Sequence, residues 1–339
     1  MSLRVFVVGY KNHARRVVKS ILRSQLCSEI FVYHPEIEKL NEIEDLGSSI
    51  RRTNDLTVAI KCSCVFICSP SNTHISYLKE LLRLSSEHGC EPYIYCEKPV
   101  AVTLKEVEWL ETNFSRFAAR LKVGFNFLYS DFVIEASSCI GNNSIGKPIS
   151  AFFQVSHGLA SKKDFASNWR ARDTNPFSQL VGNLSIHYIH ASQYLFGKVK
   201  NFFLSESNAF ASENPDSMSL SLHHECGVHS HIFCSYATVF TSHFSLYFTD
   251  GLLDQTSEGL VLMSPRDTFN EAGEFTLPPK IFLSKQSAQR DVTLDKSINN
   301  FLQDALNNVD FGSIELMSAI EASKLVIEVT SKTFHPSRQ

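Results

Sequence analysis

The sequence predicts an α/β protein with two different sheets. Up to about residue 120, short apolar runs alternate with helical patterns, which is typical of βαβ units and of a doubly wound parallel sheet. From about residue 146 onward, strands of period two dominate, which indicates an α+β domain with a large, mainly antiparallel open sheet. The chain of 339 residues is also long for a single core. We therefore expect one domain over 1–120 and a second over 121–339 that includes the C-terminal helices.

The elements of the first domain follow from its apolar runs and from the residues that separate them. The opening run is rich in β-branched residues and ends at Gly9, as a first strand does before a tight turn. The predicted strands are Val5–Gly9, Glu29–His34, Cys64–Cys68, Tyr93–Cys96 and Leu121–Phe125, and the predicted helices are Ala14–Arg23, Glu36–Leu46, Ser76–His88 and Leu104–Asn113.

The second domain is predicted from alternating apolar and polar residues. One helical run, Leu180–Phe196, interrupts the strands and ends at Gly197, which is a common helix stop. A hairpin turn is expected at Glu225-Cys226-Gly227. The predicted strands are Ile149–Ser156, Ser217–His224, Val228–Tyr236 and His243–Phe248, and helices over Ser297–Asn308 and Ser313–Lys332 finish the chain.

Charge and composition exclude several classes of partner. The net charge of −3 indicates neither nucleic-acid nor membrane-surface binding, so small-molecule or protein partners are expected. No stretch approaches the roughly 20 apolar residues of a membrane span, and the N-terminal apolar run is too short for a signal peptide. Nine cysteines, several of them inside apolar strands, favour a reducing compartment and therefore a cytoplasmic location.

Two groups of potential metal ligands occur, and we expect no metal at either. Cys62, Cys64 and Cys68 belong to a run that enters a buried strand, where thiols act as small hydrophobic side chains. His229 and His231 share a strand face because they are two residues apart, yet this spacing alone is weak evidence for a metal site.

The tripeptide Glu97-Lys98-Pro99 is the strongest candidate for chemistry. It follows a predicted buried strand, and Pro99 holds Lys98 in an extended conformation because proline disfavours helical geometry in the residue before it. Ligands of open parallel sheets bind at the carboxyl ends of the strands, where this amine would stand. The alternative interpretation is a surface ion pair at a strand exit.

The segment Gly9-Tyr10-Lys11-Asn12-His13-Ala14 stands where a dinucleotide-binding fold has its glycine-rich turn. Gly9 permits the tight turn, but Lys11 replaces the glycine that lets backbone approach a pyrophosphate; its ammonium either contacts phosphate or crowds the site. The second predicted strand ends in Tyr33-His34-Pro35, without the acid that would hold ribose hydroxyls. NADP is therefore at least as plausible a cofactor as NAD, unless His34 simply ends the strand.

The third strand is followed by Ser69-Pro70-Ser71-Asn72-Thr73-His74. These small or rigid residues would let a flat ring approach the strand end, and Asn72 or Thr73 can cap the next helix. The segment and the Glu97-Lys98-Pro99 corner would line one edge of the same sheet.

At these residues the chain resembles the Gfo/Idh/MocA family, which is named for glucose-fructose oxidoreductase and inositol dehydrogenase. The resemblance runs in the family's order through nearly the whole chain, and Glu97-Lys98-Pro99 is its most specific part. It is carried by Ser69-Pro70-x-Asn72-x-His74, Glu97-Lys98-Pro99, Val123-Gly124-Phe125-Asn126, Ile145-Gly146-Lys147-Pro148, Trp169-Arg170, His187 and Tyr194-Leu195-Phe196-Gly197.

The resemblance implies an NAD- or NADP-binding Rossmann domain and a second domain whose open sheet joins subunits into a homodimer or homotetramer. It implies that Lys98 and His187 share acid-base work on a sugar-like small molecule, with Asn183 orienting a hydroxyl. Tyr129, Trp169 and Arg170 are candidates for the substrate pocket, beside Lys98, Asn183 and His187. The expected cofactor-binding residues are Gly9, Tyr10, Lys11, Asn12, His13, His34, Ser69, Pro70, Asn72, His74, Glu97, Lys98 and Asn126.

Some working positions depart from the family pattern. Family members commonly carry aspartate at the position of Asn183, four residues before the histidine, and an amide cannot take up a proton there.

Taken as a whole, the resemblance implies an NAD(P)-dependent oxidoreductase acting on a CH-OH group of a sugar, cyclitol or nucleotide sugar. Two alternatives stay open: a non-catalytic regulatory protein that senses sugar or cofactor, and a redox-assisted glycosidase that retains its NAD.

Overall fold

The structure is a computed structural model that describes residues 2–46, 49–173, 177, 179–210, 213–265, 268–284 and 290–333. The chain forms two compact units. Unit 1 takes in Met1–Asn126 and Leu294–Lys324, and unit 2 takes in Phe127–Thr293 and the chain from Leu325 onward. The functional division predicted at residue 120, with a cofactor domain before it and a substrate domain after it, stays a prediction.

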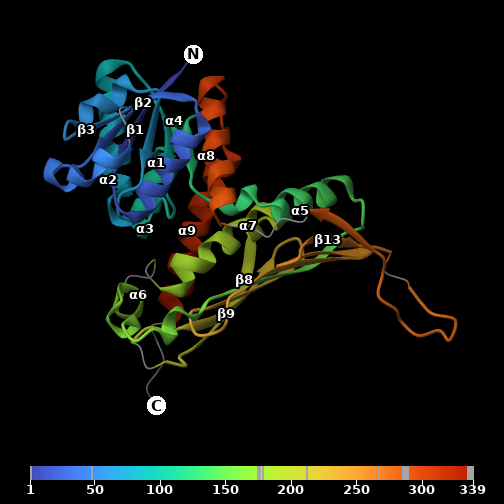
Figure 1. Ribbon diagram of the computed structural model, residues 1–339. Helices are drawn as coiled ribbons and strands as arrows, with labels where there is room; N and C mark the ends of the chain where they lie inside the picture. The colour runs from blue at the N-terminus through green and yellow to red at the C-terminus, as the bar shows by residue number, and fades with distance from the viewer. Residues whose placement is uncertain are drawn as a thin grey trace. The chain divides into compact units, whose positions relative to one another are not determined.

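Unit 1 is built on a parallel sheet of six strands in the order β3-β2-β1-β4-β5-β6. This is the strand order of a Rossmann fold, in which the chain moves outward in opposite directions from β1 and β4, so the predicted fold class is confirmed. Figure 1 shows the sheet with helices packed around it. The strands are β1 Leu3–Val8, β2 Cys27–Tyr33, β3 Ile50–Thr53, β4 Cys64–Ile67, β5 Tyr93–Cys96 and β6 Leu121–Val123.

The helices of unit 1 follow the predicted order, with differences at their ends. The segment predicted as a helix from Glu36 is a 3-10 helix, η1 Ile37–Leu46. Strand β3 was not predicted, because Arg51 and Arg52 interrupt the apolar pattern by which a strand is recognised. It lies at the edge of the sheet, where charged side chains are common. The remaining helical segments are α1 Asn12–Ser24, η2 Leu56–Lys61, η3 Ser71–Thr73, α2 His74–His88, α3 Leu104–Thr112 and α4 Phe114–Phe117.

A C-terminal helix completes the core of unit 1. Helix α8 (Arg290–Leu306) places the ring of Phe301 5.1 Å from that of Phe66 and 5.4 Å from that of Tyr95, measured between centroids. The hydroxyl groups of Tyr95 and Ser297 lie 3.1 Å apart. The sheet that carries the predicted Glu97-Lys98-Pro99 corner is therefore packed partly by a helix whose Ser297 lies 202 positions from Tyr95 in the sequence.

Unit 2 is built on a sheet of eight strands in the order β14-β13-β12-β11-β7-β10-β9-β8. Strands β7 and β10 pair in parallel and the other neighbours are antiparallel, as predicted for a mainly antiparallel sheet. The strands are β7 Pro148–Ser156, β8 Val199–Ser207, β9 Ser217–His224, β10 His229–Ser235, β11 Thr241–Phe248, β12 Gly251–Thr256, β13 Gly259–Met263 and β14 Lys280–Ser284.

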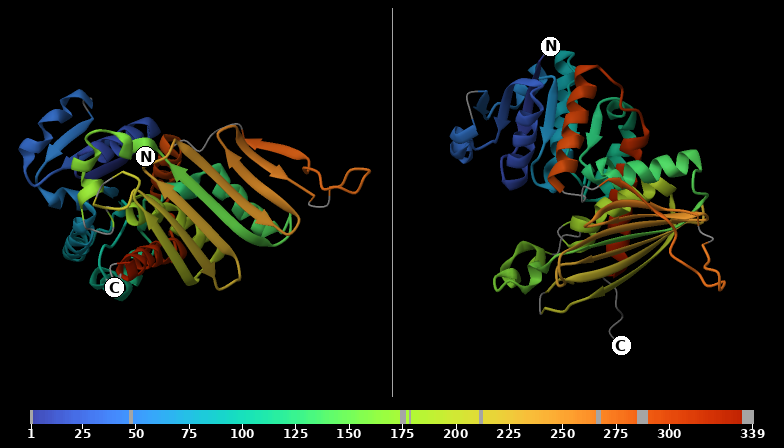
Figure 2. Two further views of the ribbon diagram at one scale, coloured as in Figure 1. Left: turned by 90° about the horizontal axis from the view of Figure 1, so that it is seen from below. Right: turned by 45° about the vertical axis from the view of Figure 1, so that its right-hand side comes forward.

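The two faces of this sheet differ. One row of paired residues, which includes Leu220, Ile232, Phe153 and Phe244, is buried. In Figures 1 and 2, helices α5 (Asp131–Asn142) and α7 (Ile186–Phe196) lie on one side of the sheet, and no helix of the described ranges covers the other side. The open side exposes large apolar side chains.

The helix predicted over Leu180–Phe196 is two segments. It begins with a π-helical turn, η7 Val181–Ser185, and continues as α7, which ends at Gly197 with φ of 77°. A π-turn inserts extra backbone into a helix and is often found at functional sites. The other helical segments of unit 2 are η4 Asn126–Tyr129, η5 Gly158–Ser161, η6 Phe165–Ser167 and α6 Trp169–Arg172, and α9 Ile314–Thr333 runs into it from unit 1.

Residue Gly227 has φ of 90° in the turn between β9 and β10, as the predicted hairpin requires. Among the helices of the described ranges, none combines the length and apolar character needed to cross a membrane.

The packing of α8 leads to a test of unit 1. Phe301→Ala should lower the free energy of unfolding by about 3–5 kcal/mol, because it empties a fully buried aromatic site. Urea unfolding followed by circular dichroism would measure the change. Met317→Ala on α9 is the matched control; its side chain is about half exposed (51%), so a change within about 0.5 kcal/mol is expected. Equal losses in both variants would contradict the role given to α8.

Candidate active site

The turn after β1 is shaped for close backbone approach. Gly9 has φ of 90°, and its N–H donates to the carbonyl of Tyr33 at 2.9 Å. A Cβ at this position would lie 3.2 Å from the carbonyl oxygen of Cys68, so the turn also abuts the end of β4. Only glycine meets both conditions without strain.

Helix α1 starts directly after this turn with its first turn open to an anion. Its N-cap residue Lys11 has extended backbone and makes no side-chain capping hydrogen bond, and the first turn contains no acid. The first N–H groups of a helix lack intrahelical acceptors, and its dipole favours negative charge there. The turn and helix therefore suit a pyrophosphate, as in other dinucleotide-binding folds.

The Glu97-Lys98-Pro99 corner lies at the carboxyl end of β5. The N–H of Glu97 continues the ladder by donating to the carbonyl of Ile67 at 2.9 Å, and the Lys98–Pro99 peptide is cis. Glu97 is buried and Lys98 is half-buried. A Cβ on Gly124 would lie 3.0 Å from Cε1 of Tyr95 and 3.1 Å from Oε2 of Glu97, so a larger residue after β6 would crowd both side chains.

The corner and the nucleotide turn are joined by an ion pair. Nε2 of His13, in the first turn of α1, lies 2.8 Å from Oε1 of Glu97. Burial is the largest influence on the pKa of Glu97 and raises it, but the charge and hydrogen bond of His13, then Lys98 and His74, outweigh burial. The net pKa of Glu97 is lowered, so a carboxylate is held inside the protein beside Lys98 and the imidazole of His13, which carries a charge when it is protonated.

His74 fixes the loops after β4 and β5 to each other. Its Nδ1 lies 2.8 Å from the carbonyl oxygen of Pro99, and its Nε2 lies 2.9 Å from that of Ser69. A neutral imidazole has one N–H, so both contacts are hydrogen bonds only when the ring is protonated. Burial, the largest influence, lowers the pKa of His74, while the two carbonyls and the nearby Glu97 oppose this.

The capping role predicted for the loop after β4 is wrong. Thr73 is the N-cap residue of α2, but it makes no side-chain capping hydrogen bond. Its hydroxyl instead contacts the hydroxyl of Ser69 at 2.8 Å and the carbonyl of Pro70 at 2.7 Å, because the 3-10 turn η3 intervenes before the helix. Asn72 is exposed within η3.

In unit 2, the predicted hydroxyl-orienting residue lies in the π-turn. The Nδ2 of Asn183 donates to the hydroxyl of Tyr236 at 2.9 Å, and His187 is half-buried one turn further along, in α7. Burial raises the pKa of Tyr236, whereas its hydrogen bond with Asn183 and the charge of Arg170 lower it in part. By contrast, complete burial lowers the pKa of His190 to about 3, as suits a packed core histidine.

Two residues of this cluster were not singled out from the sequence. The ring of His157 stacks on that of Tyr236 with 5.0 Å between centroids, and Tyr236 follows the end of β10. The guanidinium of Arg170 lies over the ring of Trp169, 4.2 Å from its centroid. In the sequence, the only signal for Tyr236 is that it is an aromatic residue directly after a strand of alternating apolar and polar residues.

The predicted site residues fall into two groups. Unit 1 brings together the nucleotide turn, the loop after β4 and the Glu97-Lys98-Pro99 corner, with His34 at the end of β2. Unit 2 contains Tyr129 in η4, Trp169 and Arg170 in α6, and Asn183 and His187. Asn126 belongs to unit 1 and begins η4. Within the described ranges, no group of three or more His, Cys, Asp or Glu side chains is arranged to hold a metal ion.

Comparison with known proteins gives two family matches. Residues 3–125 match the model described as "Oxidoreductase family, NAD-binding Rossmann fold", and residues 133–254 match the GFO/IDH/MocA C-terminal domain. Together the two matches cover most of the chain.

Similar proteins include enzymes that act on sugars. Over 164 residues the chain is 30% identical to glucose-6-phosphate 3-dehydrogenase of Bacillus subtilis, a match that spans 48% of this chain and 43% of that protein. The chain thus spans less than half the length of the curated relatives it matches.

Solved structures with the same fold match almost the whole chain. An NAD-binding oxidoreductase from Klebsiella pneumoniae is similar with a TM-score of 0.81 and 15% identity, over 99% of this chain and 98% of that one. Levoglucosan dehydrogenase in complex with NADH and levoglucosan is similar with a TM-score of 0.77 and 15% identity, over 98% of both chains. At these identities the likeness establishes the fold.

The buried carboxylate predicts a pH dependence of stability. The pKa of Glu97 is lower in the folded protein than its ordinary 4.5, so its ionisation stabilises the fold fully above pH 4.5, and this contribution is lost as pH falls through the folded pKa. Glu97→Gln should therefore lower the free energy of unfolding by about 1–3 kcal/mol near pH 6 and by less near pH 3.5. Urea titrations at both pH values measure this.

Glu108→Gln is the control for this measurement, because its side chain is exposed on α3. It should change the free energy of unfolding by less than about 0.5 kcal/mol at either pH. A difference between wild type and Glu97→Gln that stays constant from pH 6 to 3.5 would contradict the assigned ionisation.

Proposed function

The chain belongs to the Gfo/Idh/MocA family of oxidoreductases, and on that premise we propose that it transfers a hydride between NAD(P) and a sugar-like substrate. The reacting group would be a hydroxyl or carbonyl of a sugar, a cyclitol or a nucleotide sugar. The observation that carries the proposal is the Glu97-Lys98-Pro99 corner at the carboxyl end of β5, which the 2.8 Å contact of Glu97 with His13 ties to the nucleotide turn. An amine is thus held where the ligands of open parallel sheets bind.

The residues of unit 1 fit a nicotinamide dinucleotide. The glycine at position 9 lets the turn pack against Cys68, and α1 presents an uncapped first turn without acids to the pyrophosphate. When bound, the nicotinamide would accept or supply the hydride. The proposed cofactor-binding residues also include Tyr10, Asn12, Ser69, Pro70, Asn72, His74 and Asn126.

Lys98 and His187 are the proposed acid-base residues. Oxidation of an alcohol releases a proton as the hydride leaves, so a positioned amine or imidazole must accept it. Glu97, beside Lys98, is held as a carboxylate and favours a positive charge on its neighbours. The amide of Asn183 is held by Tyr236 at 2.9 Å and would orient a substrate hydroxyl. Tyr129, Trp169 and Arg170 are proposed for the pocket wall.

One observation favours a second candidate function, that of a non-catalytic regulatory protein which senses sugar or cofactor. Asn183 is an amide four residues before His187, and an amide can neither take up a proton nor stabilise a protonated histidine by its charge. Such a protein would bind the dinucleotide and show no turnover with any sugar.

We also propose that the protein works as a homodimer or homotetramer in the cytoplasm. The open side of the unit 2 sheet carries an aromatic group in which Phe152 stacks on His231 at 4.7 Å and meets Tyr247 at 5.7 Å, between centroids. Exposed apolar surface of this kind marks interaction sites. All nine cysteines are free thiols, which suits a reducing compartment.

The catalytic assignment is tested with Lys98→Met. Absorbance at 340 nm, followed with NAD or NADP and a panel of sugars and cyclitols, should reveal turnover in the wild-type protein and a loss of about 10²–10⁴-fold in kcat for the variant. Lys105→Met, which removes an exposed lysine of α3, should keep wild-type kcat. Unchanged kcat in Lys98→Met would refute the assignment, and dinucleotide binding without turnover of any substrate would favour the regulatory alternative.

The subunit contact is tested with Phe152→Glu. A charge on the open side of the sheet should dissociate the oligomer, because burying an unpaired carboxylate is costly. Light scattering coupled to size-exclusion chromatography measures the mass. Phe275→Glu is the control; it changes an aromatic side chain that is 84% exposed and lies outside the strands. A monomeric wild type, or an unchanged mass for Phe152→Glu, would refute the contact.

A further inference from the structure

The end of β2 lacks the acidic residue by which NAD-specific Rossmann domains select NAD. In NAD-specific Rossmann domains an acid at this point accepts hydrogen bonds from the adenosine ribose, and a carboxylate there repels a 2′-phosphate. Here β2 ends at Tyr33, and the next residue is His34, which is half-buried. We propose that the adenosine-ribose subsite of this chain selects a 2′-phosphorylated cofactor, NADP(H), through Lys11 and His34; this rests on the proposed function.

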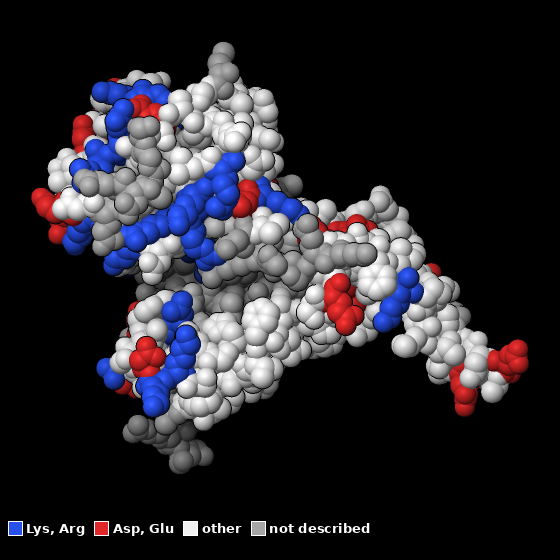
Figure 3. All heavy atoms as spheres, in the orientation of Figure 1, with Lys and Arg blue, Asp and Glu red and all other residues white. Residues whose placement is uncertain are grey.

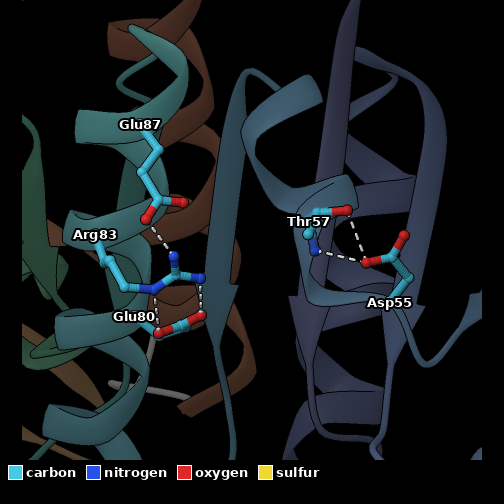
Figure 4. A network of polar contacts seen from close by, with 5 residues as sticks. All are labelled: Asp55, Thr57, Glu80, Arg83 and Glu87. Atoms are coloured by element: carbon cyan, nitrogen blue, oxygen red, sulfur yellow. Dashed lines mark hydrogen bonds and ion pairs between the residues drawn. The ribbon is translucent and has the colours of Figure 1, made fainter.

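Acids near this strand end are held by partners of their own. The carboxylate of Glu36 pairs with the ammonium of Lys39 at 2.7 Å. Figure 4 shows two others: Asp55 accepts from the backbone N–H and the hydroxyl of Thr57, and Glu80 forms a two-pronged contact with Arg83. A neighbouring cation therefore neutralises the charges of Glu36 and Glu80, and the carboxylate of Asp55 caps the start of η2.

His34 is oriented as a hydrogen-bond donor. Its backbone N–H donates to the carbonyl of Thr53 at 3.2 Å, which fixes the end of β2 to β3. Its Nδ1 lies 3.0 Å from the N–H of Glu36 and accepts from it, so the ring proton of the neutral form belongs on Nε2. An N–H at this end of the strand can donate to a phosphate oxygen.

Lys11 belongs to the same strand end. The hydrogen bond from Gly9 to the carbonyl of Tyr33 places the nucleotide turn against the end of β2, two residues from Lys11 and one from His34. The ammonium of Lys11 is exposed at the helix start, and a lysine is a good point charge for phosphate. Lys11 thus occupies the position at which a glycine would let the backbone approach the pyrophosphate. Its ammonium is suited to binding an additional phosphate.

The charge of α1 reinforces this preference. Its surface carries a row of cations, which Figure 3 shows as a band of Lys and Arg side chains across unit 1. Cations spaced along one helix face create a positive potential that favours the more highly charged dinucleotide. The row comprises Lys11, Arg15, Arg16 and Lys19, and it ends at Arg23, whose guanidinium pairs with the carboxylate of Asp295 at 2.5 Å.

Binding rather than turnover tests the inference. Quenching of protein fluorescence by NADPH and by NADH gives both dissociation constants, and NADPH should bind at least about tenfold more tightly at low salt. The advantage should shrink as ionic strength rises, because the added phosphate contacts are ionic. In competition with bound NADPH, adenosine 2′,5′-bisphosphate should displace it better than 5′-AMP does.

Two variants assign the selectivity to residues. Lys11→Met should reduce the NADPH advantage about tenfold and leave NADH binding nearly unchanged. His34→Asp should reverse the preference, because the new carboxylate repels the 2′-phosphate and accepts from ribose hydroxyls. Lys105→Met is the matched control: it removes the same charge from the exposed surface of α3, outside the row of cations on α1, and the ratio of the two dissociation constants should change by less than about twofold.

The possible failures are distinct. Binding of NADH as tight as that of NADPH, or equal effects of Lys11→Met and Lys105→Met, would overturn this inference and leave the proposed oxidoreductase function intact. Failure of both dinucleotides to bind would overturn the proposed function and this inference together.

Discussion

The contact between His13 and Glu97 is the interaction on which the arrangement of unit 1 depends most. It joins the first turn of α1 to the end of β5, with 2.8 Å between Nε2 and Oε1. A carboxylate this deeply buried would be unfavourable alone, and it is retained because Lys98 and the imidazoles of His13 and His74 surround it. The same carboxylate stands next to Lys98, so the proposed phosphate-binding turn and the proposed catalytic amine share one electrostatic centre.

A second set of contacts makes the carboxyl edge of the sheet rigid. His74 lies between the carbonyls of Ser69 and Pro99, and the glycines at positions 9 and 124 let neighbouring strand ends approach within van der Waals contact. The contacts of His74 and Gly9 are with backbone atoms, which move less than side chains do, whereas Gly124 makes room for the side chains of Tyr95 and Glu97. A site that must hold a cofactor and an amine in fixed geometry benefits from such support.

The sequence could predict much of unit 1 because its signals are local. Continuous apolar runs marked β4 and β5, which are buried on both faces, and the order of strands and helices sufficed for the fold class. Strand β3 was missed since its two arginines break the pattern, and β8, β12, β13 and β14 were missed in unit 2. The π-turn at Val181–Ser185 could not be foreseen, because it is a single turn within a longer helix and is too short to change the side-chain pattern of the whole segment.

By itself the sequence determined which residues we propose for the chemistry: a proline-locked lysine, a glycine turn followed by a cation, and a strand end without an acid. Only the tertiary structure decided what these residues contact. The ion pair of Glu97 with His13 joins positions 84 residues apart, and the packing of Phe301 on Tyr95 joins positions even further apart. Such contacts depend on sheet order and helix packing, which bring distant segments together, and no local pattern in the sequence records them.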